Sequence, residues 1–392
     1  MIKAHYICSE CGREYDINPE NMVCQSCSSK QEKDKPLRGI LDVVFDYNID
    51  HNFDPLDLLP VEREYFPQMP VGDTPLWKPR NLREETGFQN LFIKDDTLNP
   101  TGSLKDRASL LVAGFALKHG IKNISVASTG NAGSSMAGLG AVSGLDTTVF
   151  VPKNAPEAKL IQVLQYGARL IPVDGDYDHA YQLSIEYSKR GNSLSRNTAY
   201  NPLTIEGKKT VALEIFRDLG KTPDIIFVPT GDGVILSAVY KGFLDLINGG
   251  VIDRMPTIFA VQSTGSDAIC RALKTGDFGE AYPARTLADS ICVAVPSNGY
   301  HVINLLKKFD GQCIGVTDND ILTSQKKLSM TTGLFAEPAA AASLAGFLAV
   351  KEKIPQDAVV VILVTGSGLK DLKAARENVE FPATAIDSIE EL

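Results

Sequence analysis

Short apolar runs rich in β-branched residues alternate with longer helical patterns through most of the chain after residue 75. Each run has the length of a buried strand; the runs are ISVAS (124–128), TTVFVP (147–152), RLIPV (169–173), DIIFVPT (224–230), TIFAVQ (257–262) and AVVVILVTG (358–366). Helical patterns lie between them, at residues 104–120, 157–167, 207–220 and 338–353. Strands that alternate with helices pair in parallel and are covered on both faces, so this order predicts an α/β fold built on open parallel sheets.

Length and charge narrow the class of protein further. A chain of 392 residues is long enough for about two to three domains, and no apolar run approaches the ~20 residues of a membrane-spanning helix. The 39 basic and 48 acidic side chains leave a net charge of −9, which argues against a protein that coats nucleic acid or anionic lipid. The first residues, MIKAHYICSECG, lack the features of a signal peptide, so we expect a cytoplasmic protein without nucleic-acid or membrane partners.

The cysteines are unevenly placed, and four of the seven lie near the start of the chain, as Cys8, Cys11, Cys24 and Cys27. Two C-x2-C pairs separated by twelve residues can bring four thiolates to the corners of a tetrahedron. We therefore expect a structural zinc ribbon at residues 1–35; the alternatives are a pair of disulfides or a ribbon that holds no metal. The other cysteines lie in apolar stretches and are expected to be buried small hydrophobes: Cys270, Cys292 and Cys313.

Between the ribbon and the first regular element the chain has a linker-like composition. Residues 31–39, QEKDKPLRG, are mostly charged, and the stretch that follows up to about residue 75 is rich in aspartate and proline. We expect this stretch to be irregular and wrapped over a larger body.

Three of the strand runs lead directly into glycine-rich turns. The turns are TGNAGSS after ISVAS, GDGVILSA after FVPT and GSGLKD after VVILVT. Each places free backbone N–H groups at the amino end of a helix, which suits an anion such as a phosphate or carboxylate. Two other glycine or lysine patterns, at 138–144 and 206–210, lack the flanking strand or glycine of a nucleotide-binding loop, and we dismiss them.

Lys105 follows a Pro-Thr-Gly-Ser turn in the segment NPTGSLKDR (99–107) and is expected to begin a helix. The positive helix end and nearby desolvation would lower the pKa of its amine, and such a lysine can form a Schiff base with an aldehyde. The alternative is an exposed lysine in a first helical turn, paired with Asp106.

The segment NPTGSLKDR closely resembles the pyridoxal-phosphate lysine segment of the threonine synthases, members of the tryptophan-synthase-like fold type II of pyridoxal-phosphate enzymes. Further motifs of that family follow in the same order: GDTPL (72–76), STGN (128–131), NPLTIEGKKT (201–210), VPTGDGVILSA (228–238), AEPAAAAS (336–343) and VTGSGLKD (364–371). Cysteine ribbons at the amino terminus also occur in that group. The resemblance implies two open α/β domains after the ribbon, a large cofactor-binding domain of residues 36–90 and 205–392 and a small substrate-side domain of residues 91–204.

The resemblance also assigns roles to individual residues. Lys105 would carry pyridoxal 5'-phosphate and then shuttle protons, Asn131 would hydrogen-bond the pyridine 3'-oxygen, and Thr365 would face the pyridine nitrogen. The cofactor phosphate would lie on the backbone amides of Gly231, Asp232, Gly233, Val234 and Ile235. The substrate carboxylate would be received by Ser128, Thr129 and Gly130.

Threonine synthases act on O-phosphohomoserine, and the resemblance implies γ-elimination of phosphate followed by addition of water at Cβ to give threonine. Lys105 is the only strong candidate for the general base. A small amino-acid substrate, possibly phosphorylated, and a homodimer complete this expectation.

The chain departs from the family pattern where the substrate phosphate would bind. The usual arginine of NP-x-R-x-EGQKT is Thr204 and the usual glutamine is Lys208, while Ala132 replaces a threonine after STGN. Val234 and Ile235 also stand where glycine and asparagine are common, and VPSNG (295–299) replaces the usual RIGNP. Lys208 or Lys209 is available to compensate, and we assign Lys208 to the substrate.

These departures keep two other functions open. One is β-elimination or β-replacement on a serine- or threonine-type amino acid with the same cofactor. The other is a zinc-ribbon adaptor for nucleic acid or protein with an inert body, which the acidic balance and the set of Lys105, Asn131 and Thr365 disfavour.

Overall fold

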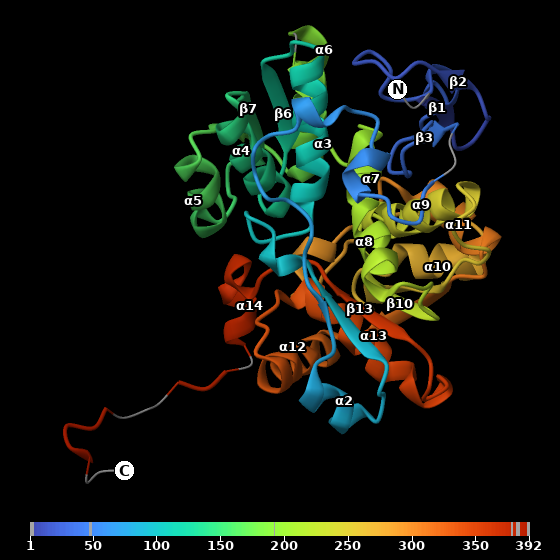
Figure 1. Ribbon diagram of the computed structural model, residues 1–392. Helices are drawn as coiled ribbons and strands as arrows, with labels where there is room; N and C mark the ends of the chain where they lie inside the picture. Colours follow the sequence, from blue (N-terminus) through green and yellow to red (C-terminus); the bar gives the residue numbers. More distant parts are fainter. Residues whose placement is uncertain (1–3, 47–48, 192, 378, 382–384, 390–392) are drawn as a thin grey trace.

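Two parallel sheets covered by helices form the body of the protein, with a small three-stranded sheet attached (Figure 1). The computed structural model describes residues 4–46, 49–191, 193–377, 379–381 and 385–389. The α/β fold with open parallel sheets is confirmed. No helix in these described ranges is long and apolar enough to cross a membrane.

The larger sheet has six strands in the order β12-β11-β10-β13-β5-β4. They are β4 (Leu76–Trp77), β5 (Leu91–Asp95), β10 (Ile225–Pro229), β11 (Thr257–Ser263), β12 (Gln312–Val316) and β13 (Val360–Val364). All pair in parallel except β4, which is antiparallel to β5. The central strands β10 and β13 are buried at every residue, as their unbroken apolar sequences require.

Helices cover both faces of this sheet. Ile226 and Val228 pack on one face with helices α8 (Thr210–Leu219), α9 (Val234–Asn248), α10 (Ala268–Thr275) and α11 (Gly299–Lys308). Phe227 lies between these two residues in the strand, so its side chain packs on the opposite face, with α2 (Arg80–Thr86), α12 (Asp318–Thr332) and α13 (Pro338–Val350). The period of two along the strand therefore divides the core into two layers.

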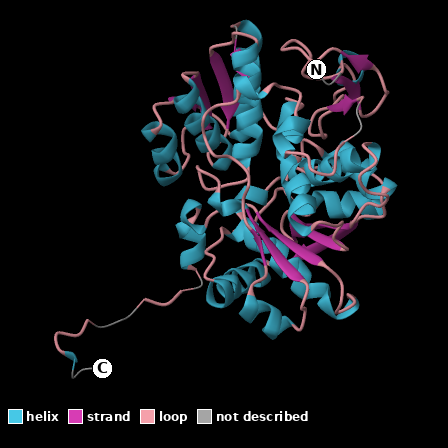
Figure 2. Ribbon diagram, in the orientation of Figure 1, coloured by secondary structure: helices cyan, strands magenta, loops and turns pink. Residues whose placement is uncertain are grey.

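The smaller sheet has four parallel strands in the order β8-β7-β6-β9. The strands are β6 (Asn123–Ala127), β7 (Asp146–Pro152), β8 (Arg169–Val173) and β9 (Ser193–Ser195). The helices around it are α3 (Lys105–Lys118), α4 (Asn131–Ser143), α5 (Glu157–Gln165) and α6 (Tyr177–Arg190). Helix α7 (Leu203–Lys208) packs between α3 and α9. Figure 2 shows this sheet and the larger one as two separate groups of strands, each with its own helices.

The small sheet near the amino terminus has the order β2-β1-β3. Its elements are β1 (Ala4–Cys8), β2 (Glu14–Tyr15), the short helix α1 (Gln25–Ser28) and β3 (Leu41–Phe45). The prediction of irregular structure is wrong for β3, because LDVVF pairs antiparallel with β1 along its whole length. Together β1, β2, α1 and β3 are called the ribbon below.

The structure also places β5 differently from the predicted small domain of residues 91–204. This strand pairs with β13 and β4, so it belongs to the six-stranded sheet. The remaining regular elements are α14 (Leu372–Arg376) and single 3-10 turns at Pro55–Leu58, Arg63–Tyr65, Asp96–Leu98, Asp289–Ile291, Lys351–Lys353 and Gly368–Lys370.

A disulfide joins Cys270 to Cys313, which corrects the prediction that both are simply buried small hydrophobes; Cys270 is buried and Cys313 only partly so. Helix α10 packs against β12, and this brings the two cysteines together although 43 residues separate them in sequence. The pairing of these two cysteines depends on tertiary packing, so their spacing in the sequence does not predict it. Cys292 is free and partly buried.

This disulfide yields a stability prediction. Closing a loop of 43 residues restricts the unfolded chain, and in the chain-entropy model this contributes about 4 kcal/mol. A variant with both C270A and C313A should therefore unfold at lower denaturant concentration than the wild type, and dithiothreitol should lower the midpoint of the wild type but not of the variant. Cys292→Ala is the matched control; an equal response to reductant in wild type and double variant would contradict the prediction.

Candidate active site

Lys105 is the first residue of α3, as the turn before it predicts. That turn is attached to the carboxyl end of β13, where the Leu104 N–H donates to the Thr365 carbonyl at 2.9 Å. Gly102 adopts a left-handed φ of 87°, which lets the chain turn sharply into the helix. The lysine and the VTGSG turn thus meet at the junction between the two sheets.

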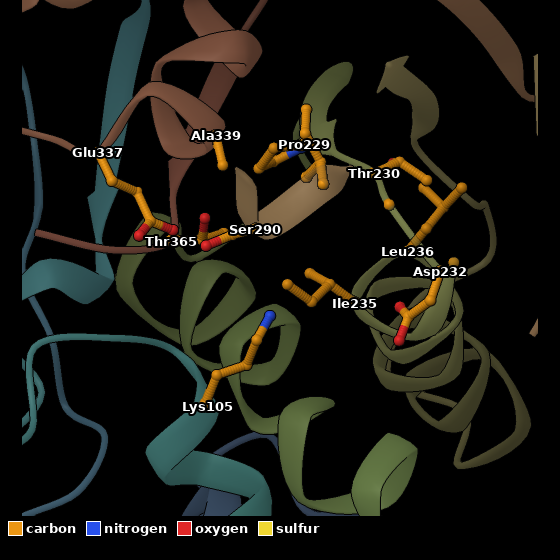
Figure 3. Close-up of a pocket in the computed structure, with 13 residues that line it drawn as sticks. Lys105, Pro229, Thr230, Asp232, Ile235, Leu236, Ser290, Glu337, Ala339 and Thr365 are labelled. Carbon is orange, nitrogen blue, oxygen red and sulfur yellow. The ribbon is translucent and has the colours of Figure 1, made fainter. Parts of the chain in front are cut away.

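A pocket lies in front of the Lys105 amine, at the carboxyl ends of β10 and β13 (Figure 3). It is lined by Lys105, Pro229, Thr230, Gly231, Asp232, Gly233, Ile235, Leu236, Ser290, Ile291, Glu337, Ala339 and Thr365. This is the edge at which open α/β sheets bind ligands. The structure therefore brings the predicted lysine, most of the predicted phosphate loop and Thr365 to one cavity.

Burial lowers the pKa of the Lys105 amine. Asp232 and Glu337 oppose this shift, whereas the positive charge of Arg196 adds to it. Asp106 is not the partner of Lys105: its carboxylate accepts from the Thr101 N–H at 2.7 Å and from the Thr101 hydroxyl. The alternative of an exposed, ion-paired lysine is therefore wrong, and the amine is placed to act as a nucleophile and base.

The loop before α9 has the shape of an anion site. Gly233 has a left-handed φ of 90°, and a Cβ at Gly231 would lie 2.8 Å from the Cα of Ile291. Asn298 fixes the loop, since its N–H donates to the Asp232 carbonyl at 3.0 Å and its side chain to the Gly233 carbonyl at 3.1 Å. With the positive end of α9 behind them, the loop amides fit a phosphate group.

Asn131 is the first residue of α4 and donates its side-chain amide to both oxygens of Glu337, at 3.1 and 2.9 Å. The same nitrogen lies 3.3 Å from the Ser290 hydroxyl. Sequence reasoning assigned no role to Glu337 or Ser290. Glu337 lies within the motif AEPAAAAS (336–343), so the sequence could have marked it as a candidate site residue. Nothing in the sequence marks Ser290.

Glu337 is buried, and burial raises the pKa of its carboxyl while the hydrogen bond from Asn131 lowers it. In Figure 3 the carboxyl group of Glu337 lies on the same side of the pocket as Thr365 and Ser290. Asn131 is not itself a lining residue, but its amide is held against Glu337 and Ser290, which line the pocket.

The remaining predicted residues lie outside the pocket lining. Ser128, Thr129 and Gly130 form the turn between β6 and α4, where the Gly130 N–H donates to the Ser128 hydroxyl at 3.2 Å. Val234 is the first residue of α9, and its N–H is capped by the Asp232 carboxylate at 3.0 Å. Lys208 is buried at the end of α7.

The four sulfur atoms of the ribbon lie within 4.8 Å of one another, on Cys8, Cys11, Cys24 and Cys27. The sulfur atoms of Cys8 and Cys27 are 3.8 Å apart and those of Cys11 and Cys24 3.7 Å apart, and all four cysteines are free. The alternative of two disulfides is therefore wrong for the ribbon. Burial raises the pKa of Cys24, but hydrogen bonds from the Tyr15 hydroxyl and the Cys27 N–H outweigh it and lower the pKa to about 6.

Comparison with known proteins agrees with this geometry. Residues 68–366 match the family of pyridoxal-phosphate dependent enzymes. The protein therefore belongs to that class.

Within that class the chain belongs to the threonine synthases. It is 33% identical to a threonine synthase of Methanosarcina acetivorans, over 99% of this chain and 98% of that protein. It is 32% identical to a threonine synthase of Methanocaldococcus jannaschii, over 96% of this chain and 95% of that protein. Ribbon and body are thus both covered by these relatives.

Solved structures share the fold. Maize serine racemase superposes with a TM-score of 0.67 at 23% identity, covering 76% of this chain and 89% of that one. A threonine deaminase of Solanum lycopersicum superposes with a TM-score of 0.68 at 20% identity, covering 85% and 95%.

Proposed function

We propose that this enzyme converts O-phosphohomoserine and water into threonine and phosphate, a step of amino-acid biosynthesis. The observation that carries the proposal is the Lys105 amine, buried, with a lowered pKa, in a pocket shared with the phosphate loop and Thr365. Identity to threonine synthases over nearly the whole chain supports the choice of reaction within the class.

Each part of the site has a defined task in this proposal. Bound pyridoxal phosphate withdraws electrons and so makes the Cα and Cβ protons of the amino acid acidic. Lys105 would hold the cofactor, and its amine would carry the protons at Cα and Cβ. The turn at Ser128–Gly130 receives the substrate carboxylate at the amino end of α4, and Asn131, held by Glu337, faces the 3'-oxygen of the ring.

Thr365 is proposed to meet the ring nitrogen with a neutral hydroxyl, which does not keep a proton there as a carboxylate would. The amides of Gly231, Asp232, Gly233, Val234 and Ile235 are proposed to hold the cofactor phosphate, which would take the place of the Asp232 carboxylate on the Val234 N–H.

The test is to incubate the purified enzyme with O-phosphohomoserine, O-phosphoserine, serine or threonine in parallel. We expect equal amounts of phosphate and threonine from O-phosphohomoserine. No phosphate release from that substrate would overturn the proposal.

One observation favours the alternative, β-elimination or β-replacement on a serine- or threonine-type amino acid. Thr204, where the family usually has an arginine, is buried and donates its hydroxyl to the Asn201 carbonyl at 2.8 Å, so it offers no hydrogen bond to a substrate phosphate. A 2-oxoacid product from serine or threonine, without phosphate release from O-phosphohomoserine, would establish this second function.

We also propose that the ribbon binds one structural zinc ion through its four cysteines. Four thiols within 4.8 Å of one another fit a tetrahedral ion, and the Tyr15 hydroxyl, 3.0 Å from the Cys24 sulfur, supplies an outer hydrogen bond. The remaining proposals are a cytoplasmic location and a homodimer.

Removing this metal should unfold the ribbon without removing the active site. Cys24→Ser should lower the zinc content from about one ion per chain to none and expose residues 4–45 to protease, because metal binding supplies folding free energy here. Cofactor absorbance of the body should persist. Cys292→Ser, at a free cysteine outside the ribbon, should change neither property; a Cys24→Ser protein with unchanged zinc content would refute the site.

A further inference from the structure

Outside the pocket that holds Lys105, the buried cations of the described ranges are paired with carboxylates, with two exceptions. Apart from Lys105, six lysine and arginine side chains are buried in these ranges, and four of them form ion pairs: Lys94, Arg107, Lys209 and Lys241. The other two, Arg196 and Lys208, form no ion pair with any described carboxylate. A buried charge without a counter-charge is strongly unfavourable, so these two positions call for an anion.

Arg196 follows β9, and within the described part of the chain its side chain donates only to neutral acceptors. Its guanidinium donates to the Ser109 hydroxyl at 3.1 Å, to the Thr198 hydroxyl at 3.3 Å and to the carbonyl of Lys105 at 3.3 Å. Burial lowers the pKa of Arg196 to about 10, although the charges of Asp106 and Asp232 oppose this shift. The guanidinium is therefore held next to the backbone of the cofactor lysine without a direct bond to a described carboxylate.

Lys208 ends α7 and is only 1% exposed. No hydrogen bond of its ammonium group to any described residue is present. Burial lowers the pKa of its amine far below the usual value, and the positive charges of Arg196 and Lys105 add to this, with Asp232 opposing. Helix α7, which Lys208 ends, packs against α3, which begins at Lys105, and against α9, which follows the phosphate loop. Arg196 contacts the same start of α3 through the Lys105 carbonyl.

The neighbouring Lys209 does not share this role, because its amine is already neutralised. It pairs with Glu206 and with Asp245, at 2.7 Å from the latter, and lies over the ring of Phe45. Of the two lysines that the sequence leaves as candidates to replace the missing arginine, the structure singles out Lys208.

We propose that Arg196 and Lys208 form a receptor for a dianionic phosphoryl group on the substrate, at the end remote from its carboxylate. This inference rests on the proposed function and names the residues that read the leaving group. The other anions of the reaction have their own sites, since the cofactor phosphate has the loop before α9 and the substrate carboxylate has the turn before α4. Arg196 and Lys208 are then available to bind a third anion, the phosphoryl group of the substrate.

The test compares two ligands that differ only in the phosphoryl group. They are 2-amino-5-phosphonopentanoate, in which a methylene replaces the ester oxygen of O-phosphohomoserine, and norvaline, which lacks the phosphonate. Binding of each to the cofactor-loaded enzyme is followed by the change in cofactor absorbance, so no turnover is needed.

K208Q, which places the family's usual residue at this position, should weaken phosphonate binding by roughly 10- to 100-fold and leave norvaline binding within about twofold. R196Q should do the same; if it fails to fold with cofactor, K208Q decides alone. Lys153→Gln, at an exposed lysine of the small-sheet region paired with Asp174, is the control and should change neither affinity.

Equal weakening of both ligands by K208Q would show a structural role and overturn the receptor, as would unchanged phosphonate binding. The outcome is separable from that of the proposed function. Selective loss of phosphonate binding in an enzyme that does not release phosphate from O-phosphohomoserine would keep the receptor and reject the reaction.

Discussion

Replacing Lys105 by alanine should lower kcat by at least about a thousandfold and abolish the visible absorbance of lysine-bound cofactor. The reason is positional: the amine is buried in the pocket, and no other described side chain lining it carries an amine or an imidazole. Activity assays and absorbance spectra of the purified variant, loaded with pyridoxal phosphate, measure the two effects separately.

Lys118→Ala is the matched control, because Lys118 ends the same helix and pairs with Glu62 on the surface. It should retain both turnover and absorbance. A Lys105→Ala enzyme that keeps more than about a tenth of the activity would mean that another group carries the protons.

The largest expected effect on stability follows from Arg107, which is buried between two acidic side chains. Its guanidinium donates to Asp96 at 2.6 and 2.9 Å and to Glu214 at 2.8 Å. Arg107→Met should lower the free energy of unfolding by about 3–5 kcal/mol, because both carboxylates then remain buried without this partner. Denaturant midpoints followed by fluorescence, on cofactor-loaded protein, measure the change.

Arg80→Ala is the control for Arg107, since the ion pair of Arg80 with Glu84 is exposed and should contribute less than about 1 kcal/mol. Adding Asp96→Asn to Arg107→Met should recover part of the loss, because it removes one unpaired charge. A loss below about 1 kcal/mol in Arg107→Met would show that the two acids find other partners.

The sequence predicts the alternating strands and helices of the fold well, because these elements follow from the local periodicity of apolar residues. Residues 169–173 are predicted as a strand and observed as β8, and the helix begins at Lys105 as the turn before it indicates. In contrast, β3 was missed because its five residues form a strand only when β1 lies beside them. The Cys270–Cys313 disulfide was missed for the same reason, since only tertiary packing joins its ends.

The same distinction between local sequence and tertiary contact applies to the candidate site. Lys105 and the glycine turn at 231–233 can be predicted because each lies at a strand end or helix start, and Thr365 because VTGSGLKD resembles a family motif. The structure brings all three to one pocket. The contact of Glu337 with Asn131 and the unpaired charge of Arg196 depend on which segments meet in space. Nothing in the chain near Arg196 distinguishes it from a surface arginine.

The hydrogen bond from Leu104 to Thr365 joins an early part of the chain to a late one, so the pocket is completed late in synthesis. The two residues are separated by about two-thirds of the chain, so the ribosome completes the lysine helix long before it makes the strand that closes the pocket. At typical synthesis rates this interval lasts roughly tens of seconds. The small sheet and its helices can fold in that time, but the cofactor pocket can be completed only when nearly the whole chain has left the ribosome.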